Sequence, residues 1–140
     1  MVSPDGRWVA YVSRESGRSE VYVRPFPGPG AKSTISNGGG WHPAWSTATN
    51  ELFFDQEGQI MVARYRATKD SFQAGKAQLW SEARYTTRGG PNRMFALDPN
   101  APRFAVAPAT VGPVGANLEK VVLFVNFFEE LRRLAPPTRQ

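Results

Sequence analysis

The sequence contains no cysteine. Disulfide bonds, thiolate metal sites and a cysteine nucleophile are therefore excluded. It also contains only one histidine, His42. No catalytic triad or metal-ligand cluster is recognisable around this residue, and no serine lies in a nucleophile-elbow motif. We therefore expect no catalytic residues, no cofactor and no metal, and we expect that the chain is not an enzyme.

Long hydrophobic runs are also missing. The longest, residues 121–125, has the length of a strand, whereas a membrane-spanning helix needs about 18 apolar residues. The chain does not begin with a basic segment followed by an apolar one, the pattern of a secretion signal. We therefore expect no membrane insertion and, for the chain as it stands, a cytoplasmic location.

Charge of one sign is not concentrated anywhere. The net charge is +5, but the basic residues are scattered, with no block of five or six like charges. Nucleic-acid binding proteins carry a basic stripe or a known binding motif. Gly38-Gly39-Gly40 is not a phosphate-binding loop, because no Lys-Ser/Thr follows it and no helix is expected after it. We expect no nucleic-acid partner.

The residues that are abundant indicate an all-β fold. Hydrophobic residues make up 41% of the chain and aromatic residues 12%, and there are 13 glycines and 12 prolines. The first two values allow a packed core. So many glycines and prolines suit short strands joined by turns better than long helices.

Three stretches resemble one another: residues 3–12, 46–54 and 97–106. Each is a polar turn followed by an apolar strand. Their starts lie about 43 and 51 residues apart, close to the length of one propeller blade, which is four short antiparallel strands. Strands are expected at residues 7–13, 19–25, 32–36, 41–46, 51–55, 59–66, 77–81, 93–97, 103–108 and 119–125.

Several of these strands are apolar on both faces, as residues 8–12 show. An antiparallel sheet with one wet face alternates apolar and polar residues. Continuous apolar strands therefore predict sheets stacked face to face. We expect a single domain, a partial β-propeller of about three four-stranded blades at about 1–36, 41–82 and 84–125.

The end of the chain differs from the rest. Asn126 is a plausible N-cap, and Glu129 three residues later fits a capping box. Phe127, Leu131 and Leu134 share one helical face. We therefore expect a short C-terminal helix at about 126–134.

The stretch Ser3-Pro4-Asp5-Gly6-Arg7-Trp8 resembles the repeat signature of TolB-like, WD-like β-propellers. The resemblance continues through residues 19–28, the Gly-Gly-x-x-Pro-x-Trp-Ser stretch at 39–46 and residues 127–131. This order is similar to the carboxy-terminal blades of bacterial propellers that often follow a membrane-linked serine/threonine kinase domain. Such parent propellers are often periplasmic. They have about six blades, more than this chain, and no kinase activity is implied because no kinase domain is present.

Within the signature, Pro4, Asp5 and Gly6 are predicted to form a structural turn. Proline presets φ, aspartate bonds its own backbone, and glycine accepts a positive φ. A catalytic role for Asp5 is the alternative. Similarly, Asp55 and Glu57 flank a turn at Gly58 and are expected to form a solvated hairpin tip rather than a catalytic carboxylate pair.

A binding site is predicted on the loops. In a propeller, the loops between blades and those between second and third strands gather on one face. Arginine beside exposed aromatic residues is common at interfaces. The alternative is that Trp41 packs between blades and the arginines are solvated. The candidate binding residues are Trp41, His42, Arg14, Arg18, Arg88 and Arg93, with Glu15 and Arg84 on the same loops.

Two functions remain open. The first is a non-catalytic segment that self-associates, because a partial ring exposes two apolar blade faces; two copies of three blades would close a ring that binds protein or peptide. The second is an accessory fragment of a hydrolase, similar to the propellers of prolyl-oligopeptidase-like proteins, or of a kinase, whose catalytic domain is absent from this chain. A weaker third alternative is a small sugar or anion in a central channel.

Overall fold

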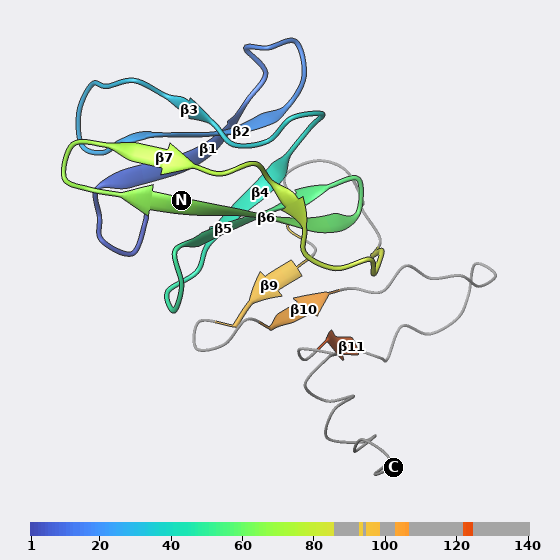
Figure 1. Cartoon of the computed structure of the whole chain (residues 1–140). Helices are drawn as coiled ribbons and strands as arrows, with labels where there is room; N and C mark the ends of the chain where they lie inside the picture. Colours follow the sequence, from blue (N-terminus) through green and yellow to red (C-terminus); the bar gives the residue numbers. More distant parts are fainter. Residues whose placement is uncertain (86–92, 94, 99–102, 107–121, 125–140) are drawn as a thin grey trace, which may run out of the picture.

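The computed structural model describes residues 1–85, 93, 95–98, 103–106 and 122–124. All regular structure in this part of the chain is β, in three antiparallel sheets of which none closes into a barrel (Figure 1). The all-β class predicted from the sequence is confirmed. The helix expected at 126–134 lies outside the described residues.

The first sheet has the order β1-β2-β3, and proline ends its middle strand. Pro25 is the last residue of β2, because a proline has no N–H for the ladder and is confined to strand ends and edges. A bridge between Val2 and Val9 extends the sheet on its other side. The strands are β1 (Trp8–Ser13), β2 (Glu20–Pro25) and β3 (Ser33–Thr34).

The second sheet is the largest, with the order β4-β5-β6-β7 and with β8 also paired to β6. The short strand β7 was not predicted, and β8 lies where an outer strand was expected at 77–81. Three residues are too few to show a period of two. The strands are β4 (Trp41–Trp45), β5 (Glu51–Gln56), β6 (Gln59–Ala67), β7 (Phe72–Ala74) and β8 (Gln78–Leu79).

The third sheet has the order β11-β10-β9. Its strands are shorter than the sequence predicts, but each lies inside the expected range. They are β9 (Phe95–Leu97), β10 (Phe104–Val106) and β11 (Val122–Phe124).

The second sheet is buried on both faces. Side chains of a strand alternate between faces, and in β5 Leu52 and Phe54 join a core cluster with Trp8 and Val21 of the first sheet. Phe53, between them, joins a second cluster that contains Phe104 of the third sheet. The sheets are therefore stacked face to face, as the doubly apolar strands predicted.

The same backbone hydrogen bond precedes a strand in each sheet. In all three, a backbone N–H donates to the carbonyl five residues later. In the third sheet the donor is Asp98, one residue beyond the start of the stretch predicted from the sequence. The bonds join Ser3 to Trp8 (2.8 Å), Ser46 to Glu51 (2.9 Å) and Asp98 to Arg103 (2.9 Å).

Different side chains hold the first two of these turns. In the first, Asp5 accepts hydrogen bonds from the Ser3 hydroxyl (2.5 Å) and the Arg7 N–H (3.2 Å), and Gly6 has φ +72°. In the second, Ser46 Oγ accepts the Thr49 N–H at 3.0 Å. A hydroxyl can thus replace the aspartate, which explains how a degenerate sequence keeps the turn.

Candidate functional site

A surface depression lies where three loops of the first two sheets meet. These are the β1–β2 turn, the link from β3 to β4, and the β5–β6 turn. Its volume is about 470 Å³. We call it the loop depression, and it is lined by Arg14, Gly17, Arg18, Ser19, Gly38, Gly39, Gly40, Trp41, Gln56 and Glu57.

The structure brings three of the six candidate binding residues together here: Arg14, Arg18 and Trp41. His42 is not part of the lining; its side chain is 15% exposed and faces Asp55. Arg88 lies outside the described residues.

Arg93 lies elsewhere and packs against the second and third sheets. Its guanidinium donates to the Pro43 carbonyl at 2.8 Å and lies 5.5 Å from the centre of the Phe95 ring. Burial lowers the pKa of this guanidinium from its ordinary value. These contacts favour a packing role for Arg93 over the predicted binding role.

Glu20 lies beneath the loop depression and organises its loops. Its carboxylate accepts the Ser36 hydroxyl and the backbone N–H groups of Gly38 (3.1 Å) and Gly39 (3.0 Å). Arg18 pairs with the same carboxylate at 3.0 Å. Glu20 was not predicted from the sequence, because its partners lie up to nineteen residues away and only the fold brings them together.

Burial disfavours the charged form of Glu20, but the hydrogen bonds from Ser36, Gly39 and Gly38, together with Arg18, outweigh it and lower its pKa. Glu20 is therefore ionised at neutral pH. Its carboxylate occupies the N–H groups of Gly38 and Gly39, which consequently cannot cradle a phosphate. This agrees with the absence of a phosphate-loop sequence.

Two opposite charges in the depression remain unpaired among the described residues. Arg14 bonds Ser19 Oγ through Nε at 3.3 Å, and no described acceptor binds its terminal nitrogens. The Glu57 side chain has no described ion pair, and its backbone φ is +51°. Both residues are exposed, and Trp41 is half-buried. The depression thus offers one cation, one anion and one aromatic surface to a ligand.

The sequence predicted that Asp55 lies at a solvated hairpin tip. That prediction is wrong. Asp55 is only 5% exposed, and its Oδ1 accepts the Gly58 N–H at 3.1 Å. Oδ2 lies 3.8 Å from Nδ1 of His42, which is too far for a hydrogen bond. The pKa of the nearby Tyr85 is raised, mainly by burial and to a smaller extent by the charge of Asp55. The carboxylate points inward because it closes the β5–β6 turn.

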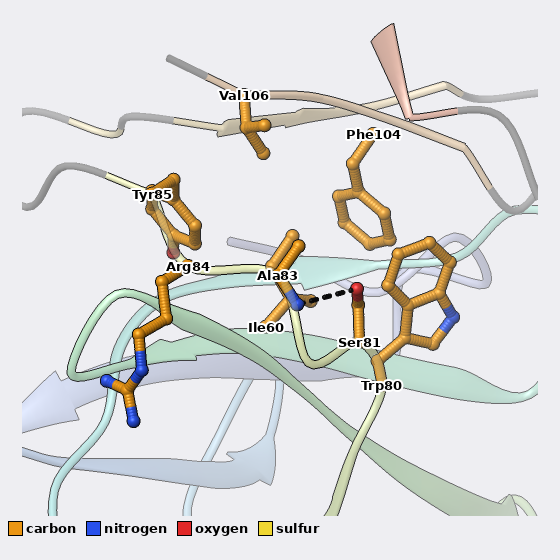
Figure 2. Close-up of a pocket in the computed structure, with 8 residues that line it drawn as sticks. All are labelled: Ile60, Trp80, Ser81, Ala83, Arg84, Tyr85, Phe104 and Val106. Atoms are coloured by element: carbon orange, nitrogen blue, oxygen red, sulfur yellow. Dashed lines mark hydrogen bonds between the residues drawn. The ribbon is translucent and has the colours of Figure 1, made fainter. Parts of the chain in front are cut away.

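A second hollow lies beneath the third sheet and is mostly apolar (Figure 2). It is lined by Ile60, Trp80 and Phe104 among others, and its free volume of about 10 Å³ holds about one water. The guanidinium of Arg84 points away from it, as Figure 2 shows. This hollow is a gap in core packing, and it offers no room for a ligand.

A third, polar hollow of about 250 Å³ lies between the turns of the first two sheets. Its charged residues Asp5 and Arg7 pair with each other at 3.0 Å. The loop depression is larger and has unpaired charge, so it is the stronger candidate site.

No family model matches the chain, and neither a curated protein nor a solved structure is significantly similar to it. No group of three or more metal-ligating side chains is found in the part of the chain that the structure describes. Within the same residues, no helix has the length and apolarity needed to cross a membrane.

Proposed function

We propose that this chain is a segment of a TolB-like, WD-like β-propeller that acts as a non-catalytic binding module. The observation that carries the proposal is the second sheet, which has a hydrophobic core on each face. A sandwich of two sheets would have only one core. The backbone hydrogen bond that recurs in all three sheets supports a repeated unit.

The loop depression supports protein or peptide as the ligand. Arginine and tryptophan are enriched where proteins bind one another. His42, next to Trp41, and Glu57, in the lining, both have φ +51° and are the only described non-glycine residues with a positive φ. Such strained residues cluster at functional sites.

A second copy of the chain is the partner that would complete the ring. Among the described residues, the second sheet is covered on both faces, whereas the first contributes to a core on one face only. Its outer face carries the partly exposed Tyr11, which stacks on the buried Tyr22 with ring centroids 5.8 Å apart. Arg24 lies 5.9 Å from the Tyr11 ring, and Lys32 lies 5.1 Å from the Tyr22 ring. This face is aromatic and cationic, rather than purely apolar as the sequence analysis expected.

Light scattering after size-exclusion chromatography tests the ring. We expect a mass of about twice 15.5 kDa at micromolar concentration, because a two-fold pair is the commonest closed assembly. Tyr11→Glu should shift the chain to the monomer, because it places a carboxylate on the outer face of the first sheet. Lys69→Glu, an exposed charge change elsewhere, is the control. If the wild type is a monomer at micromolar concentration, the proposed ring closure is wrong.

A further inference from the structure

We propose that the loop depression recognises a short peptide segment in which an acidic and a basic side chain flank an apolar one. This inference rests on the proposed binding function and gives it a ligand chemistry. It follows from the two unpaired charges and the aromatic surface between the loops.

The acidic side chain of the ligand binds Arg14. The other arginine in the depression, Arg18, is already paired with Glu20 at 3.0 Å. The N–H groups of Gly38 and Gly39 are bonded to the same carboxylate. No acceptor within residues 1–85 or the other described segments binds the terminal nitrogens of Arg14. They can therefore pair with a carboxylate of the ligand, and this pairing is often bidentate.

The basic side chain of the ligand binds Glu57, on the turn between β5 and β6. The main chain of Glu57 is held in place, because Arg84 donates to the Glu57 carbonyl at 3.4 Å. The turn is closed by the hydrogen bond from the Gly58 N–H to Asp55. The Glu57 carboxylate disfavours a ligand of uniformly negative charge, since like charges brought together repel. A polyanion such as nucleic acid therefore fits the depression less well than a peptide of mixed charge.

Trp41 supplies the apolar surface. It is half-buried, and the ring of His42 lies beside it in a tilted arrangement with ring centroids 6.2 Å apart. A tryptophan held by a neighbouring ring loses little side-chain entropy on binding. The depression of about 470 Å³ is within the range of about 300–1,000 Å³ typical of small ligand sites, so it suits a few side chains and not a folded domain.

The test is a fluorescence anisotropy titration of the full chain with labelled peptides. Each peptide contains one Asp and one Lys separated by one to four residues, and one of the separating residues is Phe. Both orders, Asp before Lys and Lys before Asp, are included. Matched peptides carry Asn and Gln instead. We expect the best mixed-charge peptide to bind at least about tenfold more tightly than its uncharged match, a difference of about 1.4 kcal/mol.

Charge reversal identifies the contacts. Arg14→Glu should weaken binding of the best peptide about tenfold or more, and replacing the peptide Asp by Lys should restore it. Glu57→Lys should behave in the same way toward a peptide whose Lys is replaced by Asp. Arg66→Glu, the same change on an exposed residue outside the depression, is the control. Circular dichroism shows whether each variant is folded.

The outcomes separate the inference from the proposed function. If uncharged peptides bind as tightly and Trp41→Ala weakens them, the binding function stands and the charge pattern is wrong. The same conclusion follows if neither charge reversal changes the affinity. If no peptide of either set binds, peptide binding by the loop depression is wrong, and the charge pattern with it.

Discussion

At the scale of the residue, Glu20 shows how a buried charge can be structural. Four groups donate to or pair with its carboxylate, from Ser36, Gly38, Gly39 and Arg18. Charged groups buried in a protein are stable only with such partners. The network joins the beginning of β2 to the link that leads into β4, so it positions two of the three loops around the depression.

Replacing this carboxylate should destabilise the protein. In Glu20→Gln the amide oxygen can still accept from the glycine N–H groups, but the NH2 group then replaces the oxygen that accepts the Ser36 hydroxyl, and the charge facing Arg18 is lost. We therefore expect the free energy of unfolding to fall by about 1–3 kcal/mol. Glu15→Gln, which removes a surface pair with Lys32, should change it by less than about 1 kcal/mol. Urea denaturation at pH 7 measures both. Equal effects would show that the Glu20 network contributes no more than a surface pair.

The pH dependence has a defined sign. The pKa of Glu20 is lower in the folded protein than its ordinary value of 4.5. Its stabilisation is therefore fully present above about pH 4.5 and is lost as the pH falls through the lower, folded pKa. The difference in unfolding free energy between wild type and Glu20→Gln should shrink from pH 6 to pH 3. A difference that stays constant would contradict the lowered pKa.

Gly40 gives a second prediction for a single residue. A Cβ added there would lie 2.6 Å from Ser36 Oγ and 3.0 Å from Val21 Cγ2. Gly40→Ala should therefore lower the free energy of unfolding by about 1–3 kcal/mol, the usual range for overpacking. Gly75→Ala is the matched control, because its nearest atom is at 3.4 Å. If thermal or urea denaturation shows equal effects, the close approach at Gly40 is wrong.

At the scale of the element, β5 is the strand that depends on the stacking of sheets. Phe53 and Phe54 are neighbours on opposite faces, and they are 1% and 0% exposed. In a sheet with one solvated face, one of the two would be exposed. The strand can be apolar throughout because the first sheet covers one face and the third covers the other.

Truncating either phenylalanine should therefore destabilise the protein strongly. We expect Phe53→Ala and Phe54→Ala each to lower the free energy of unfolding by about 3–5 kcal/mol. Phe53 and Phe104 lie in edge-to-face contact at 4.9 Å, so a double-mutant cycle should give about 0.5–1.5 kcal/mol of coupling. Phe53→Ala with a loss under about 1 kcal/mol would mean that the third sheet does not cover β5 in solution. Urea denaturation measures all four proteins of the cycle.

At the scale of the whole molecule, self-association should appear in thermal stability. A folded dimer that dissociates on unfolding has a midpoint temperature that rises with protein concentration. We expect this rise for the wild type between about 1 and 100 μM, and not for Tyr11→Glu. Differential scanning fluorimetry measures it. The same midpoint at every concentration would agree with a monomer and count against the ring.

The sequence by itself determined which segments form strands and turns. Apolar runs, the Pro25–Gly30 interruption and the Pro4-Asp5-Gly6 turn are local signals that act within a few residues, and most strands lie within a few residues of their predicted positions. Continuous apolar strands also predicted the stacking of sheets. The shared position of Arg14, Arg18 and Trp41 followed from loop order along the chain.

Only the tertiary structure decided which polar groups are buried and which stay free. Asp55 turns inward and Glu20 gathers donors from a distant link, because a carboxylate excluded from water must find partners wherever the fold supplies them. The charges of Arg14 and Glu57 face one depression because the turns that carry them are brought together by the packing of two sheets. Such pairings depend on contacts between distant segments, and no local pattern of residues encodes them.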